Sequence, residues 1–514
     1  LNNTGLAFGP DGALYAASYG TSNGSIFRFD VPESERHPAR DETREILATA
    51  SGEQSLHQLR RWLDHPDQRV RMKGQFELAH RGTRGGGSEE LQKALTSGTE
   101  TQLGKLHAIW GIGQIARREP MMLTFLMPAW DSGDAELIAQ CAKVTGDTEG
   151  GVANFPALLA GLHHESPRVR FFCAIAAGKR RYAAAIPGLI KILEDDGASD
   201  AYLRHAAIMG LAGAMPADQL AALSSHPQRA VRLGAVVALR RLASPEVRAF
   251  LKDADELVVL EAARAIHDDA SIPAALPDLA AVLAREGLLN EALLRRAINA
   301  AFRSGTERGL AHLVSFLERG EGSPALRRTA LASILWWSQP PVLDPVEGRY
   351  REHAPRDASA PNAAVAKLLP HIEADPGLLE VLLNGVAVRG EPGWLKGNLA
   401  SFNTWPAPLQ SKLFDALAKT RSAELRTFVE QGLTSPHAVV RESARKHATQ
   451  AGVPLLDSLL AILDDPEPAG QGRAVLQLAE LDGPVARQKV AALAERFRAG
   501  EAAPAWKLEL WQAA

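Results

Sequence analysis

The residues best suited to binding in this chain of 514 residues form one basic and aromatic segment. Arginine and aromatic side chains often dominate binding contacts, so such a cluster could hold a partner domain or an acidic ligand. Against this stands a structural role, in which the two tryptophans strap a loop across the neighbouring helices. The candidates are Trp336, Trp337, Arg349, Tyr350, Arg351, His353 and Arg356.

Prolines mark residues 339–360 as a connecting loop. They stand at positions 340, 341, 345 and 355, and a helix interior does not tolerate proline at this density. A loop of this length inside a compact array is uncommon and is often functional.

Two other sets of residues could bind metal. Cys141 and Cys173 lie 32 residues apart, at the same place in adjacent repeats. Neighbouring helix axes stand roughly 8–10 Å apart, whereas a disulfide needs Cα atoms within about 7 Å. We therefore expect buried free thiols rather than a disulfide or metal pair. His163 and His164 are adjacent without a metal-ligand spacing, which predicts surface histidines at a helix end.

Glycines and arginines complete the inventory. Residues 85–87 are three glycines, but no Lys-Ser/Thr ending follows them, so we expect a connector rather than a phosphate loop. An arginine recurs once per repeat at 71, 170, 232 and 441, which favours bracing between repeats over anion binding. No Ser-His-Asp set or catalytic carboxylate pair can be singled out, so we name no catalytic, cofactor-binding or metal-binding residue.

Helix pairs must position all of these residues. Segments 155–162, 186–193 and 276–283 are apolar at i, i+3, i+4 and i+7 and carry a proline near their start, as the first helix of a pair would. Second helices carry the pattern Pro-x-x-x-Val-Arg, and the arginine or its equivalent recurs every 28 to 35 residues. This period predicts an all-α fold, an α-solenoid over 45–338 that continues over 361–514. The pattern resembles HEAT repeats of the short, lyase-like bacterial kind.

The first 32 residues differ from the rest because their pattern alternates as strands do. Pro10 and Gly12 favour a tight turn between two strands, a second turn is expected at 21–24, and 25–30 alternates like a third strand. Three short antiparallel strands cannot bury a core of their own.

Composition excludes several classes of protein. Lys and Arg number 57 against 60 Asp and Glu, a net charge of −3, so no basic excess points to nucleic acid. No apolar run reaches the roughly 18 residues of a membrane span. Two cysteines exclude a disulfide scaffold or a four-cysteine zinc site.

Four motifs together resemble one family. Residues 8–15 (Phe-Gly-Pro-Asp-Gly-x-Leu-Tyr) are similar to a blade of a sorbosone-dehydrogenase-type β-propeller. Trp-Trp-Ser-x-Pro at 336–340 followed by Asp-Pro-Val-Glu-Gly-Arg-Tyr-Arg at 344–351 resembles the PVC-type haem-binding, membrane-bound dehydrogenase-like proteins. The segments 65–71 and 107–114 fit the same family.

The resemblance implies a propeller, then HEAT repeats, then a cytochrome c domain. Residues 1–32 would be the last blade of a truncated propeller, and the helical repeats would be truncated at the C-terminus. The chain would then be a non-catalytic spacer between propeller and cytochrome domains of the same polypeptide. The full-length protein would carry haem c and be periplasmic or otherwise extracytoplasmic.

The alternative function is a stand-alone protein-binding solenoid with no redox role. Its partner would lie on the concave face, and this hypothesis predicts exposed apolar or single-sign residues along the inner helices.

Overall fold

Helices form most of the regular structure. The computed structural model describes residues 3–18, 24–37, 39–150, 155–268, 272–287, 290–354, 356–389, 399–463, 471–481 and 483–500. The chain divides into two compact units, residues 1–265 (unit 1) and 266–514 (unit 2), which are described separately. No helix among the residues described is both long and apolar enough to cross a membrane.

A three-stranded antiparallel sheet begins unit 1, as predicted. Its strands β1 (Asn3–Phe8), β2 (Leu14–Ser18) and β3 (Ser25–Phe29) lie in sequence order. Gly12 takes the positive φ (72°) that the first turn requires. Residues 19–23, which include most of the predicted second turn, lie outside the described residues.

The sheet is held to the helices by polar bonds at the first turn. Arg69 Nη1 donates to the carbonyls of Phe8 (3.1 Å) and Gly9 (2.6 Å), and Arg40 Nε donates to Asp11 O (2.9 Å). One face of the sheet lacks cover: the strand register places four exposed apolar side chains on it. They are Leu6, Phe8, Phe27 and Phe29.

Helix pairs build the rest of unit 1 after α1 (Ala39–Ala48). Each repeat has a first element, here called the A element, and a second, here called the B helix. The A elements are α2 (Leu56–Trp62), α4 (Gly87–Thr96), η3 (Pro120–Leu126) with α6 (Met127–Trp130), α8 (Phe155–Gly161), α10 (Ile186–Asp195), α12 (Ala217–Ala222) and η6 (Pro245–Lys252). The B helices are α3 (Gln68–Arg81), α5 (Gln102–Ala116), α7 (Ala135–Asp147), α9 (Pro167–Lys179), α11 (Ala201–Ala214) and α13 (Arg229–Arg241). The next helix, α14 (Glu256–His267), contains the boundary between the units.

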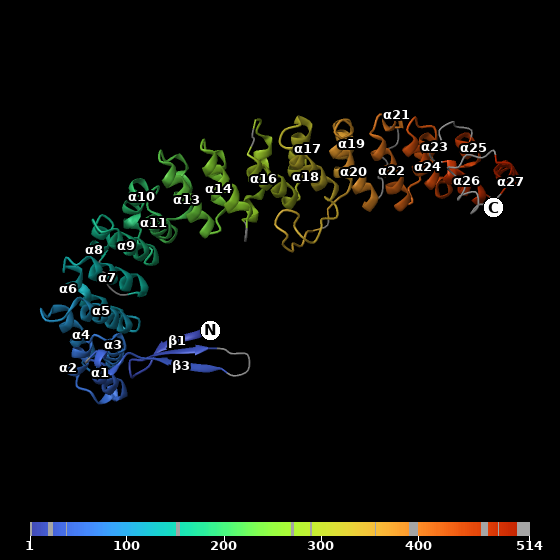
Figure 1. The fold of residues 1–514 in the computed structure, drawn as a ribbon. Coiled ribbons are helices and arrows are strands. Elements are labelled where there is room, and N and C mark those ends of the chain that lie inside the picture. Colours follow the sequence, from blue (N-terminus) through green and yellow to red (C-terminus); the bar gives the residue numbers. More distant parts are fainter. Residues whose placement is uncertain are drawn as a thin grey trace. The chain divides into compact units, whose positions relative to one another are not determined.

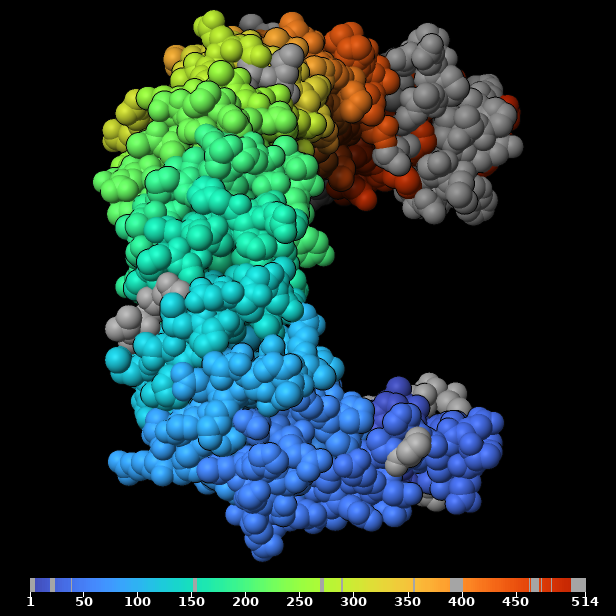
Figure 2. All heavy atoms as spheres, turned by 90° about the vertical axis from the view of Figure 1, so that its left-hand side faces the viewer, coloured from blue at the N-terminus to red at the C-terminus, as the bar shows by residue number. Residues whose placement is uncertain are grey.

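Successive B helices pack directly against one another, from α3 to α13. Within unit 1 they line the inner side of a curve and the A elements line its outer side (Figure 1). Seen from the A side, the repeats of unit 1 form one continuous surface (Figure 2). This arrangement follows from the sequence period, because each pair covers its neighbour's apolar stripe.

Small residues allow the closest of these contacts, between α7, α9 and α11. A Cβ on Gly146 would stand 2.8 Å from the Cα of Ala176, and one on Gly178 would stand 2.7 Å from the carbonyl oxygen of Met209. A larger side chain at Gly146 or Gly178 would therefore push two B helices apart.

Unit 2 repeats the same pairing. Its A elements are α15 (Leu276–Ala280) with η8 (Ala281–Ala284), α17 (Glu307–Arg319), α19 (Ser359–Glu373), α21 (Leu399–Phe402), α23 (Leu425–Leu433) and α25 (Leu456–Leu463). Its B helices are α16 (Glu291–Ser304), α18 (Pro324–Leu335), α20 (Pro376–Arg389), α22 (Ala407–Lys419), α24 (Ala438–Ala451) and α26 (Gln471–Glu480), after which α27 (Pro484–Arg498) follows.

Two details differ from the sequence prediction. The segment expected as one helix over 276–283 is α-helical only to Ala280 and continues as a 3₁₀ turn. Helix α19 begins at Ser359, inside the segment 339–360 that was expected to be loop.

Candidate functional site

The basic and aromatic segment forms a short hairpin in unit 2, more ordered than the loop that its prolines predict. Asp344 N donates to Arg349 O (2.8 Å) and Arg351 N donates to Val342 O (2.9 Å), which pairs Leu343 with Tyr350. Residues 342–351, here called the hairpin, therefore have fixed geometry. Prolines exclude a helix there, but they do not exclude strand pairing at an edge.

A buried carboxylate anchors the hairpin. Asp344 Oδ1 accepts the backbone N–H groups of Val346 and Glu347 (both 2.9 Å) and the side-chain amide of Asn299 on α16 (3.3 Å). Arg351 Nε lies 3.4 Å from Asp344 Oδ2. Burial by itself would raise the pKa of Asp344, but the two N–H groups and Arg303 outweigh it, so the pKa lies below its ordinary value.

Asn299 connects this carboxylate to a buried histidine. Its Oδ1 lies 2.7 Å from His267 Nε2, and His267 Nδ1 lies 2.9 Å from Asp268 Oδ1. Because the Asn299 amide nitrogen donates to Asp344, its oxygen must face His267. Oxygen acceptors thus flank both ring nitrogens, and the ring donates from both, which is its protonated form.

His267, Asp268 and Glu347 also have the spacing of a metal site, with ligand atoms within 4.8 Å of one another. Arginines already occupy the position of a cation here. Arg296 donates two hydrogen bonds to Asp268 (2.9 and 2.8 Å), and Arg351 forms an ion pair with Glu347. The arrangement therefore fits a network of matched charges better than a metal centre.

A second anchor holds the end of the segment. Arg356 Nη1 donates to Phe302 O (2.7 Å), and its guanidinium lies 4.9 Å from the ring centroid of Trp337 and 5.2 Å from that of Phe302. His353 packs on the same Phe302 ring at 5.8 Å. Burial lowers the pKa of Arg356 and that of His353.

The structure therefore divides the seven predicted residues. Trp337, Arg351, His353 and Arg356 strap the segment to the helices, and Trp336 is half-buried. Arg349 and Tyr350 face solvent, and the Tyr350 hydroxyl donates to Glu352 (3.1 Å). These contacts match the structural alternative for most of the cluster. Ligand binding by the two outer residues stays a prediction.

The repeated arginines brace the turn of their own repeat. In all four, Nη1 donates to the carbonyls five and six residues earlier, where the A element ends: these are Arg71 (2.8 and 2.7 Å), Arg170 (3.3 and 3.0 Å), Arg232 (3.1 and 2.9 Å) and Arg441 (3.0 and 2.8 Å). Bracing between repeats is added where Arg170 reaches Asp196 and Arg232 reaches Asp253. The prediction of bracing is confirmed, although most of it lies within a repeat.

The other sequence candidates also have structural roles. Cys141 and Cys173 are free and buried, as predicted, and burial raises the pKa of Cys173 to about 12. His163 is exposed, while His164 is half-buried and its Nδ1 accepts the N–H of Ser166 (3.0 Å). Residues 85–87 form the turn from α3 into α4, where Gly86 has a φ of 74°.

Sequence reasoning located no residue on the B-helix face of unit 1, where large apolar side chains are open to solvent. Four of them fall on four different B helices: Phe76 (48% exposed), Leu103 (48%), Tyr202 (78%) and Val237 (39%). Leu103 and Tyr202 stand two residues before their repeat's arginine-equivalent position, and Phe76 and Val237 stand five after it. Alignment of the repeats on that position was the signal that could have found them.

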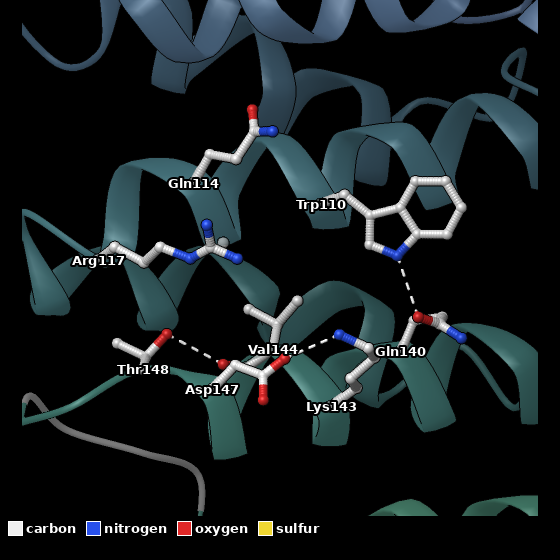
Figure 3. A pocket seen from close by; sticks show the side chains of 9 residues that line it. Trp110, Gln114, Arg117, Gln140, Lys143, Val144, Asp147 and Thr148 are labelled. Atoms are coloured by element: carbon white, nitrogen blue, oxygen red, sulfur yellow. Dashed lines mark hydrogen bonds and ion pairs between the residues drawn. The ribbon is translucent and has the colours of Figure 1, made fainter.

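A groove of about 370 Å³ opens between α5 and α7, here called the first groove (Figure 3). Trp110 and Gln114 line it from α5, and Arg117 lines it from the end of that helix. Trp110 Nε1 donates to Gln140 Oε1 (3.0 Å), and Lys143 Nζ donates to Asp147 (2.7 Å) on the α7 side. The ring face of Trp110 therefore sits in a rim of polar and cationic groups.

A second groove of about 320 Å³ lies between α9 and α11. Phe171, Phe172 and Tyr202 line it, and the Arg168 guanidinium lies 5.2 Å from the centroid of the Phe172 ring. Its polar neighbours are already bonded: Arg168 pairs with Glu136, and Asp200 caps α11 by accepting the N–H of Tyr202 (2.8 Å). This second groove offers mainly an aromatic surface.

Comparisons with known proteins agree with this architecture. Residues 123–212, from η3 to α11, match the HEAT repeats family. A chain of the structure in which Kap95p binds RanGDP is 12% identical over 90% of this chain and 66% of that one, with a TM-score of 0.36. Importin beta is 14% identical over 86% of this chain and 65% of its own (TM-score 0.30), and an engineered protein is 16% identical over 77% and 98% (TM-score 0.28). No characterised protein sequence matches the chain.

These matches support the HEAT-repeat part of the sequence resemblance and leave its haem-binding, dehydrogenase-like part untested. The chain spans about two thirds of the length of the first two solved relatives. Together with the stacked helix pairs, the family match identifies the chain as an α-solenoid of HEAT-like repeats.

Proposed function

We propose that the chain is a protein-binding solenoid and that the B-helix face of unit 1 is its binding surface. The observation that carries this proposal is the row of exposed Phe76, Leu103, Tyr202 and Val237 on α3, α5, α11 and α13. Large apolar side chains in contact with water gain roughly 25 cal/mol per Å² when a partner covers them. Their repetition along one face favours one extended partner over several separate ligands.

The chemistry of the two grooves supports a protein partner. Tyr202, Phe172 and Trp110 are the aromatic types that anchor protein interfaces. Polar groups beside them are bonded within the chain, so a partner would cover apolar rings without stranding charges.

Site-specific photo-crosslinking tests this proposal. A benzophenone amino acid at Phe76 or Val237 should capture a specific protein, whereas the same group at Met121 on the A side should not. Partner and chain, purified separately, should then re-form the complex, and Tyr202→Ser should weaken it by about tenfold. Equal capture from Met121, or a complex indifferent to Tyr202→Ser, would count against the B-helix face.

A second proposal keeps the function that the sequence resemblance implies. We propose that the chain also serves as the spacer of an extracytoplasmic, haem c-containing dehydrogenase-like protein, next to propeller and cytochrome domains. The observation in its favour is the uncovered apolar face of the sheet, with Leu6, Phe8, Phe27 and Phe29 exposed between 39% and 66%. Such a face suits packing against further β-structure.

Sequencing the complete reading frame tests the spacer proposal. Further propeller blades and a Cys-x-x-Cys-His site are expected, together with a haem c absorbance spectrum of the intact protein. A complete frame without both features would contradict it.

A further inference from the structure

We propose that the B-helix face of unit 1 takes an extended, acidic segment of a partner protein. The segment would place one apolar side chain in the first groove and another in the second, six or seven residues apart. This inference rests on the proposed function and specifies the chemistry of the partner.

Each groove presents a surface suited to one apolar anchor. In the second groove Tyr202 is 78% exposed beside Phe171 and Phe172, and the nearby Asp200 is bonded to the start of α11. In the first groove the indole N–H of Trp110 is taken by Gln140, which leaves its ring face. An aliphatic, proline or aromatic side chain would remove these rings from water without leaving a polar group unpaired.

The spacing of the anchors follows from the repeat geometry. Two helix intervals separate the α5/α7 groove from the α9/α11 groove, which is about 18 Å at ordinary helix packing distances. The first groove lies towards the C-terminal ends of its helices, and the second lies at the first turns of α9 and α11. This offset of some eight residues adds roughly 12 Å along the helix axes.

The combined separation is roughly 22 Å, which an extended chain spans in six or seven residues at about 3.3 Å per residue. A helical segment would need about fourteen residues for the same distance. The spacing of the two anchors therefore distinguishes an extended from a helical partner.

Charge on the surface between the grooves favours an acidic segment. Asp147 is shared by Lys143 (2.7 Å) and Lys179 (2.5 Å), so one carboxylate faces two ammonium groups. Both lysines keep about half of their side chains exposed, at 48% and 51%. Over both grooves and the surface between them, four cations face three carboxylates: Arg117, Lys143, Arg168 and Lys179 against Glu136, Asp147 and Asp200.

Asp200 is moreover committed to the N-terminus of α11, where two backbone N–H groups bond to it. Its charge is therefore partly offset. The surplus of positive charge complements aspartate or glutamate between the two anchors.

Selection from a random peptide library on the full chain tests the inference. Peptides of about twelve residues, long enough to span both grooves, should be enriched with two apolar residues six or seven positions apart and acidic residues between them. Affinity of the synthesised peptides should fall by about tenfold in Tyr202→Ser and in Trp110→Ala, and by several-fold in Lys143→Glu. Met121→Ser, an exposed apolar residue on the A side, is the matched control and should leave the affinity unchanged.

The other outcomes overturn the inference. Enriched peptides with basic spacers, or with anchors about fourteen residues apart, would exclude an extended acidic segment but leave the proposed function standing. Peptides that bind equally to Tyr202→Ser would also overturn it. If the photo-crosslinked partner likewise ignored Tyr202→Ser, the proposed function would fail as well.

Discussion

The hairpin of unit 2 and the B-helix face of unit 1 present opposite kinds of surface. Around the hairpin, charged side chains are concentrated but meet one another: Asp344 with Arg351, and Asp268 with Arg296. On the B-helix face, apolar side chains such as Tyr202 remain in water.

The difference shows why an unusual sequence segment need not be a binding site. Charged residues are conspicuous in a sequence whether they bind each other or a ligand, and here the matched charges hold the segment in place. Exposed apolar residues are inconspicuous because a helix of the same composition could be buried. In this protein the second kind of surface has the greater capacity for binding.

Removal of Asp344 should give the largest effect on stability. Asp344→Ala leaves Arg351, Asn299 and two backbone N–H groups without their buried partner, so we expect a loss of about 3 kcal/mol in the free energy of unfolding of unit 2. Urea unfolding, with hydrogen exchange resolved to α16 and the hairpin, measures it. Glu352→Ala, which removes an exposed carboxylate of the same segment, is the control, and an equal loss in both would contradict the role of Asp344 as anchor.

Loss of a bracing arginine should have a smaller effect. Arg232→Ala removes two bonds to its own turn and a half-buried ion pair with Asp253, so we expect about 1–2 kcal/mol. A double-mutant cycle with Asp253→Ala isolates the pair between repeats. Arg248→Ala, whose ion pair with Glu246 is exposed, should cost less than about 0.5 kcal/mol.

Acid should weaken unit 2 by the same network. The pKa values of Asp344 and Asp268 are lowered in the folded chain, so these carboxylates stabilise it above their ordinary pKa of 3.8. That stability is lost as the pH falls through their folded pKa values. Stability measured from pH 6 to pH 2 should fall less steeply in Asp344→Asn than in the wild type; parallel curves would exclude Asp344 as a source.

Replacement of the most exposed aromatic should have the smallest effect on stability. Tyr202→Ser removes a side chain that is 78% exposed, so the free energy of unfolding should change by less than about 0.5 kcal/mol. The same urea unfolding checks this. A loss comparable to that of Asp344→Ala would mean that Tyr202 supports the fold, and the contrast between the two regions would disappear.

Local patterns in the sequence were sufficient to predict the helices, the strands and the buried cysteines. The 3.6-residue period of α10 and the alternation of β3 each depend on neighbouring residues alone. Cys141 and Cys173 could be placed because every repeat has the same inward positions. The hairpin could not, because the partners of Asp344 on α16 lie about 45 residues away in the chain and no period connects them.

The sequence by itself determined the stacking of helix pairs, since an apolar stripe on each pair requires a neighbour to cover it. Only the tertiary structure decided which arginines are committed to carbonyls and carboxylates, and which aromatic rings stay in water. Composition and period are properties of a single segment. Pairing and exposure depend on which other segments the fold brings within a few ångströms.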